Sequence, residues 1–289
     1  MDRGRLSSLL ISVVSVLRSL PLFIAARPRT PLRVLCVMAF DALYALRTSK
    51  RPSKSSLRAL AALLDFGACA NAAFDNKGFC RNEFRATRQL LREAGWNSSV
   101  IEYLRRLRKL ERSRPSPGGV PWQFHTVQLY REAVVRVSLE TLVAAVIGRP
   151  CREEGGRSTY RDQGLELLFR MVMQCQIIDD VVDYSKDASA GLPSFLTASD
   201  SLSLAFELTR QVTLEYADDR DLARTGDVFP FRVALAGVST CAKLVLLLGR
   251  WRRRYCLAPR VPELVDTPRL PAVDGSSRRS APAVRQAAM

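Results

Sequence analysis

The stretch that decides the fold runs Met173-Gln-Cys-Gln-Ile-Ile-Asp-Asp-Val-Val-Asp-Tyr-Ser-Lys-Asp187. Four aspartates stand in it beside paired isoleucines and valines, which would bury such a helix in a bundle. At about 100° of rotation per residue, Asp183 lies about 40° around the helix from Asp179, and Asp187 lies about another 40° on. Gln176 and Asp180 fall inside or beside the same arc. The stretch therefore predicts one acidic face at the end of a long buried helix.

Carboxylates stacked at positions i, i+4 and i+8 repel each other, and this repulsion weakens a helix unless a cation compensates it. Arginine can do so, but magnesium fits better, because it prefers carboxylate oxygens, keeps water ligands and shares further ligands with substrate phosphates. We therefore expect Asp179, Asp183 and Asp187, with Asp180 beside them, to bind Mg²⁺. The alternative is a solvated acidic helix end, although such a face is not normally set between Ile-Ile and Val-Val.

The rest of the chain repeats the helical pattern. Apolar residues recur at helical spacing, whereas alternating strand-like runs and hairpin turns are absent from the sequence. The pattern predicts an all-α fold with a single helical domain over 1–258. Residues 259–289, rich in Pro, Ser, Ala and Arg, are expected to form a disordered tail. The predicted helices span 5–25, 31–48, 54–75, 82–95, 98–112, 124–148, 158–187, 195–217 and 228–256.

The composition narrows the choice of partners. The chain has 44 Lys and Arg residues against 28 Asp and Glu, a formal net charge of +16, which favours anionic partners such as nucleic acid, acidic lipid headgroups or phosphorylated small molecules. Nucleic acid is the less favoured partner, because the basic residues are spread along helical segments without a recognition pattern beside them. A single histidine and the lack of a phosphate loop or dinucleotide fingerprint disfavour other common chemistries.

Localisation is expected to be cytoplasmic. The seven cysteines show no metal-ligand spacing and are interpreted as reduced thiols. The largely apolar run from Leu6 to Ala26 is interrupted by Arg18 and Pro21, which favours an ordinary first helix over a signal or an anchor. Peripheral attachment to a membrane stays an alternative, since a basic helix with apolar side chains can lie in the headgroup layer.

The acidic stretch resembles the second aspartate-rich motif of trans-prenyl diphosphate synthases, which runs Gln, two variable residues, Asp-Asp, two variable residues, Asp. In this chain the pattern is Gln176-Ile-Ile-Asp-Asp-Val-Val-Asp183. It is also similar to squalene and phytoene synthases, because Asp183, Asp187 and Gly191-Leu192-Pro193 match part of their pattern, although the basic residues of that pattern are missing. The close resemblance covers 173–193, and the remaining helical chain matches only in outline.

This resemblance to the class I isoprenoid synthase superfamily implies a single-domain helical bundle around a central cavity. It also implies a second acidic helix that faces the first across the cavity. The matching segment is Leu63–Asp75, in which Asp65 is expected to add a metal ligand and Asn71 or Asp75 to assist. The family's dense first motif, with aspartates three or four apart, is not present in this segment. Condensation of two substrates, cyclisation of one and loss of activity therefore all stay open.

Basic and amide side chains are the remaining candidates for contacts with a diphosphate. Arg131 lies early in a predicted helix, and Arg254 with Tyr255 resembles the Arg-Tyr pair that bacterial terpene synthases place on a late helix. Gln176 and Lys186 are expected to contact the substrate. The sequence thus predicts a Mg²⁺-dependent isoprenoid synthase, either a prenyltransferase or a terpene synthase, that ionises an allylic prenyl diphosphate. The alternative is a non-catalytic helical protein that binds a membrane surface or nucleic acid.

Overall fold

All regular secondary structure in the part of the chain that the structure describes is helical. The computed structural model describes residues 13, 14, 17, 31–48, 50–75, 79–115, 122–147, 163–220 and 229–256, and these ranges contain no strand. The predicted all-α class is therefore confirmed. The helices are α2 Pro31–Thr48, α3 Lys54–Phe74, α4 Arg81–Glu93, α5 Asn97–Arg112, α6 Trp122–Ile147, α7 Gln163–Val182, α8 Tyr184–Ala190, α9 Leu202–Ala217 and α10 Phe229–Cys256.

Most helix boundaries fall within a few residues of the prediction, with two differences. The predicted helix over 158–187 is interrupted at Asp183, where α7 has ended and α8 has not yet begun. The predicted helix over 195–217 begins only at Leu202, because turns and bends occupy 195–200. The predicted first helix over 5–25 lies outside the described residues except for three helical positions within it, and the predicted tail over 259–289 lies wholly outside them.

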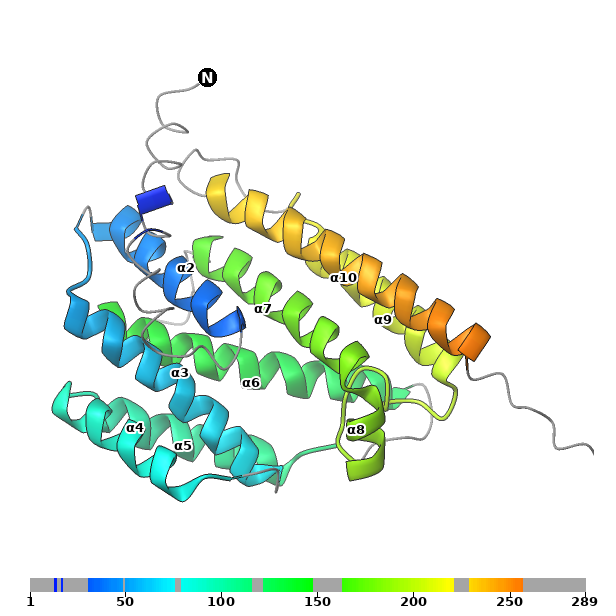
Figure 1. Ribbon diagram of the computed structural model, residues 1–289, viewed down its shortest axis with the longest axis horizontal. Helices are drawn as coiled ribbons and strands as arrows, with labels where there is room; N and C mark the ends of the chain where they lie inside the picture. Colours follow the sequence, from blue (N-terminus) through cyan, green and yellow to red (C-terminus); the bar gives the residue numbers. More distant parts are fainter. Residues whose placement is uncertain are drawn as a thin grey trace, which may run out of the picture.

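Helix α7 is the centre of the bundle (Figure 1). Helices α9 and α10 pack along one side of α7, and α6 and α2 pack against other sides of it. Helix α3 packs on α2, α4 and α6, and α4 and α5 complete this second part of the bundle. The acidic end of α7 and the short α8 lie at the end of the bundle opposite the connection between α2 and α3 (Figure 1).

The position of α7 follows from its composition, because apolar side chains cover most of its circumference. Met173 and Ile177 are fully buried, and so are Phe40 of α2, Phe66 of α3 and Leu107 of α5 in the same hydrophobic core. Burying a side chain of this size contributes roughly 1.5–3 kcal/mol. These side chains thus join four helices, α2, α3, α5 and α7, in one apolar core.

Polar and small residues fix α9 and α10 against the other side of α7. The buried Gln174 side chain donates from Nε2 to the Thr213 carbonyl oxygen at 2.8 Å and to Ser239 Oγ at 3.1 Å. Near the other end of the contact, a Cβ atom on Gly249 would lie 2.8 Å from Val181 Cγ1. The close approach of α10 to α7 therefore requires a glycine at position 249.

Two described helices are long and apolar enough to cross a membrane by length and composition alone. Half of the apolar window in Lys54–Phe74 is buried inside the bundle, as expected for a core helix. Only 28% of the window in Pro230–Arg252 is buried. More of the apolar window of α10 than of α3 is therefore exposed on the surface of the described helices.

Candidate functional site

A cavity of about 410 Å³ lies between α3, α5 and α6, with further lining residues from α2, α4 and α7. Small side chains form its α3 wall, among them Gly67, Ala68 and Ala72, and branched ones such as Val134 and Leu139 form the α6 wall. Ligand sites for small molecules commonly span about 300–1,000 Å³ and are mainly apolar. The helical bundle therefore contains a cavity, open to solvent on one side, of suitable size and lining for an apolar ligand.

A few polar side chains from different helices reach the same cavity. Asp65 and Asn71 come from α3, Arg131 comes from α6 and Gln176 comes from α7. Three residues proposed from the sequence, Asp65, Arg131 and Gln176, therefore line one cavity although they are far apart in the chain. Convergent polar groups in an apolar pocket are the usual arrangement for orienting a ligand.

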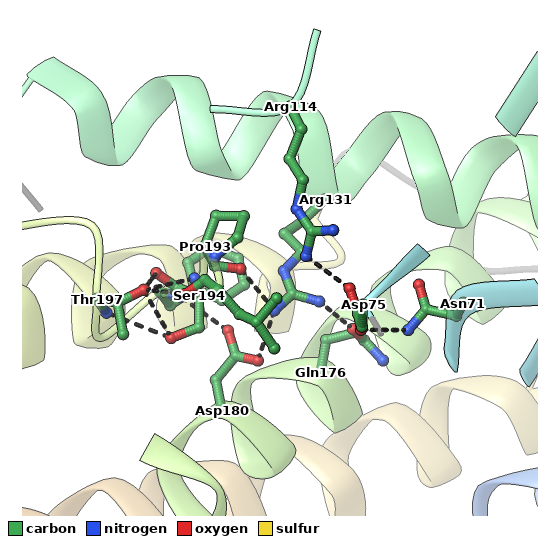
Figure 2. A network of polar contacts seen from close by, with 11 residues as sticks. Asn71, Asp75, Arg114, Arg131, Gln176, Asp180, Pro193, Ser194 and Thr197 are labelled. Atoms are coloured by element: carbon green, nitrogen blue, oxygen red, sulfur yellow. Dashed lines mark hydrogen bonds and ion pairs between the residues drawn. The ribbon is translucent and has the colours of Figure 1, made fainter. Parts of the chain in front are cut away.

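Arg131 connects α6 to α7 and to the segment that follows α8 (Figure 2). Its Nη1 donates to Gln176 Oε1 at 3.1 Å, and its Nη2 donates to Asp180 Oδ1 at 3.0 Å and to the Pro193 carbonyl oxygen at 2.9 Å. The Arg131 Nε atom is buried and has no hydrogen-bond partner. The guanidinium group is thus held in a fixed position at the cavity wall with one donor unused.

Asp180 points into the bundle, and both of its oxygens are engaged. Oδ1 accepts the bond from Arg131, and Oδ2 accepts a 2.7 Å bond from the backbone N–H of Phe195. Burial raises the pKa of Asp180 to about 6, although Arg131 and the Phe195 N–H both act to lower it. The sequence places Asp180 among the metal ligands, whereas in the structure its contacts join Arg131 to the chain after α8.

The local sequence after α8 explains how the backbone reaches Arg131. Gly191 ends α8 with a left-handed backbone, φ +63°, which a glycine adopts without the steric cost of a Cβ atom. The chain then turns inward, and Pro193 presents its carbonyl oxygen to Arg131. The Thr197 hydroxyl accepts from the Ser194 N–H at 2.8 Å and donates to the Leu192 carbonyl oxygen at 2.8 Å. These bonds hold the turn against the site.

The other three aspartates of the acidic stretch differ in exposure. Asp179 is exposed in the last turn of α7, Asp183 is partly exposed between α7 and α8, and Asp187 is buried in α8. Lys186 donates from Nζ to Asp183 Oδ1 at 2.7 Å on the surface. The single straight face expected from helical geometry is therefore interrupted at Asp183. None of these aspartates lines the 410 Å³ cavity.

These carboxylates nevertheless influence one another. Loss of hydration and the charges of Asp183 and Asp187 raise the pKa of Asp179 above its ordinary value, although one side of the residue faces solvent. Within the ranges that the structure covers, no group of three or more His, Cys, Asp or Glu side chains lies close enough together to hold a metal ion. Negative charge is thus crowded around Asp179.

A second ion-pair network, which the sequence did not indicate, joins the C-terminal end of α3 to the residues after α5. Arg114, just beyond α5, donates to Asp75 Oδ1 at 2.7 Å and to Glu111 Oε2 at 3.2 Å. Asn71 donates to Asp75 as well, at 3.3 Å, and Tyr130 donates to Glu111 Oε1 at 2.6 Å. Asp75 is therefore engaged in joining helices. The pairing partners lie up to 39 residues apart, so local spacing gives no signal for it.

The Arg254 and Tyr255 side chains lie outside the described part of the structure, although their backbone belongs to the last turns of α10. The sequence-based prediction for these two residues therefore stays a prediction.

Known proteins give no guide to this site. No protein-family model matches the chain, and no curated protein or solved structure matches it either.

Proposed function

We propose that the protein is a Mg²⁺-dependent isoprenoid synthase that ionises an allylic prenyl diphosphate, in a bundle of the class I isoprenoid synthase type. One observation carries the proposal. The apolar cavity inside the bundle is lined by Asp65 from α3 and by the hydrogen-bonded pair of Arg131 and Gln176. Gln176 is also the first residue of the Gln-x-x-Asp-Asp-x-x-Asp pattern, so the cavity and the acidic segment adjoin.

The carboxylates suit Mg²⁺ in the way that it is usually bound beside phosphates. Mg²⁺ typically takes one or two protein carboxylates and fills its remaining positions with water and phosphate oxygens. Asp179 and Asp183, with Asp187 behind them, would hold the ion, and Asp65 would face them from α3. The pKa of Asp179 is raised first by loss of hydration and then by the negative charges of Asp183 and Asp187, which a cation would offset. Bound Mg²⁺ would supply Lewis-acid stabilisation of the charge that develops on the diphosphate.

Arg131 would bind the diphosphate end of the substrate. A guanidinium group offers planar paired donors that match phosphate oxygens, and Arg131 is held at the cavity wall by three hydrogen bonds from its two terminal nitrogens. Gln176 holds Nη1 through its Oε1, which leaves its amide nitrogen as a further donor. Lys186, paired with the exposed Asp183, would add positive charge at the surface side of the same segment.

The cavity walls would contact the isoprenoid tail of the substrate. The small α3 residues leave room for an isoprenoid tail, and the apolar lining excludes water from the reacting carbon. The carbon–oxygen bond would break with its electron pair leaving on the diphosphate, and the allylic cation would be trapped by a double bond of a second isoprenoid or of its own chain. Loss of a proton would then complete the product.

A release assay tests the proposal. The purified full chain is incubated with Mg²⁺ and farnesyl or geranylgeranyl diphosphate, and free diphosphate is measured over time together with prenyl products by mass spectrometry. We expect release by the native protein and loss of at least 100-fold in rate for the Asp179→Ala plus Asp183→Ala variant, since removing charge-stabilising groups commonly costs about this much.

A matched acidic variant provides the control. Glu102→Ala plus Glu207→Ala also removes two carboxylates. These carboxylates lie on α5 and α9, where each forms an exposed ion pair with the arginine three residues later, Arg105 or Arg210. This variant should keep the native rate. If the native protein released no diphosphate from either substrate, the non-catalytic alternative would hold instead. Retardation of random DNA or RNA that fades steeply with salt would favour a nucleic-acid partner.

A further inference from the structure

Helix α10 has two contrasting faces. Phe231, Leu235 and Leu246 are buried on the side that packs against the bundle. On the outer side five large apolar side chains are each between 54% and 63% exposed: Val233, Leu244, Leu247, Leu248 and Trp251. Figure 1 shows α10 at the edge of the bundle, with α7 and α9 on its inner side. The outer apolar face therefore has no packing role among the described helices.

The exposed residues form one stripe and are not scattered. At about 100° per residue, Val233, Leu244 and Trp251 point within about 20° of one direction. Leu247 and Leu248 lie about 40–60° to either side of it. A stripe of this width along five turns is larger than the single exposed apolar residues that are normal on protein surfaces.

Basic residues flank the stripe on both sides. Lys243 is about 80° from its centre in one direction and Arg252 about 100° in the other, and both are exposed. Arg250 lies on the same side as Lys243 and pairs only loosely, at 3.8 Å, with Glu207. Long basic side chains can lay their apolar stems along the stripe and keep their charges at its border. Apolar centre and basic borders are the pattern of a helix that lies in a membrane interface.

We propose that the outer face of α10 docks the protein onto the surface of a membrane that contains anionic lipids. The apolar stripe enters the boundary between headgroups and acyl chains, and Lys243, Arg250 and Arg252 contact the acidic headgroups. The net charge of +16 adds a general attraction to such a surface. A nucleic acid would satisfy the charges but would leave the apolar stripe uncovered, so lipid fits this face better.

The contacts of the inner face argue for docking on the surface and against crossing the membrane. Arg232 forms an ion pair with Asp219, and Ser239 accepts the bond from the buried Gln174. Gly249 lies in close contact with Val181. Withdrawing α10 into a bilayer would break these contacts and expose the core of α7. The helix therefore stays part of the bundle while its outer face meets lipid.

Vesicle flotation of the full chain tests this proposal. Vesicles of phosphatidylcholine with 30% phosphatidylglycerol, a proportion chosen as roughly that of an acidic membrane surface, are compared with vesicles of phosphatidylcholine alone. The native chain should float with the anionic vesicles and bind the neutral ones more weakly. Leu244→Gln plus Leu248→Gln should weaken binding on the order of tenfold or more, because two apolar side chains no longer enter the lipid. Lys243→Gln plus Arg252→Gln should weaken binding to anionic vesicles only.

The control variant is Leu90→Gln plus Ile101→Gln, which changes two equally exposed apolar residues on α4 and α5. It should bind like the native chain. Equal binding by the α10 variants and the native chain would overturn the proposal, as would a failure of the native chain to float with any vesicle. A vesicle-free dimer in sedimentation that the Leu244→Gln plus Leu248→Gln variant dissociates would assign the face to a second copy instead. Diphosphate release in detergent-free solution does not depend on this face, so the two proposals fail separately.

Discussion

At the scale of single residues, the buried pair of Arg131 and Asp180 links the fold to the proposed site. Asp180 has only 4% of its side chain exposed, and Arg131 has 20%. Removing one partner of such a pair leaves an uncompensated charge in the interior, which costs far more than the pair itself contributes. Arg131 therefore has a structural role besides the diphosphate contact proposed for it.

The first prediction concerns this pair. Arg131→Met should lower the free energy of unfolding by about 3 kcal/mol at pH 8, because Asp180 is then left buried without its cation. Urea unfolding followed by circular dichroism measures the change. Arg105→Met removes an exposed pair with Glu102 and should change stability by less than about 1 kcal/mol. Equal effects of the two substitutions would contradict a buried role for Arg131.

The free cysteines allow a second prediction at this scale. Burial raises the pKa of the Cys36 thiol to about 12, and the nearby Cys175 adds to the effect. Cys80 and Cys241 are exposed. Because the thiolate is the reactive form, iodoacetamide at pH 8 should modify Cys80 and Cys241 well before Cys36. Peptide mass spectrometry reports the order of labelling, and early labelling of Cys36 would mean that its side of α2 is not packed against the bundle.

At the scale of helices, the sequence predicts the elements well but misses two boundaries, and side-chain contacts explain one of them. No Pro or Gly marks the interruption at Asp183, where the Lys186 and Asp187 N–H groups both donate to the Asp183 carbonyl oxygen. The late start of α9 follows from side chains that bond to the backbone in place of a helix. The Thr197 hydroxyl group accepts a bond from the Ser194 N–H and donates one to the Leu192 carbonyl oxygen. The Phe195 N–H donates a hydrogen bond to Asp180 on α7, and no local sequence pattern could reveal this bond.

A third prediction tests how α10 is packed. Gly249→Ala should destabilise the protein by about 1–3 kcal/mol, since its Cβ atom would lie 2.8 Å from Val181 and force α10 away from α7. Gly237→Ala is the matched control, because nothing lies within 4 Å of its Cβ position. It should be neutral or should stabilise the helix by up to about 1 kcal/mol. Thermal unfolding of both variants measures the difference, and a stable Gly249→Ala variant would contradict this packing.

At the scale of the whole molecule, the cavity brings together residues that the sequence could identify only one at a time. Gln176 and the aspartates around it form a local pattern that is visible in the sequence. Arg131 is 45 residues away from Gln176, and its hydrogen bond to that residue depends on how α6 packs on α7. The cavity beside them depends on the packing of several helices, which apolar periodicity does not specify. The sequence could therefore predict candidate residues but not which of them share a cavity.

A fourth prediction uses the small side chains of the α3 wall. Ala72→Phe should fill part of the cavity and weaken binding of farnesyl diphosphate on the order of tenfold, because an aromatic ring replaces space for the tail. Ala73→Phe adds the same ring at the neighbouring exposed position, which does not line the cavity. It should bind farnesyl diphosphate like the native chain. Titration calorimetry with Mg²⁺ present compares the two, and equal affinities would exclude the cavity as the tail site.

The most direct measurement places the isoprenoid tail itself. A farnesyl diphosphate analogue with a diazirine in its tail is bound with Mg²⁺, activated by light and mapped by peptide mass spectrometry. We expect cross-links to α3 between Gly67 and Ala72 and to α6 between Val134 and Leu142, and we expect excess farnesyl diphosphate to prevent them. Cross-links confined to the outer face of α10, or none that the diphosphate can compete away, would contradict a prenyl diphosphate site in the cavity.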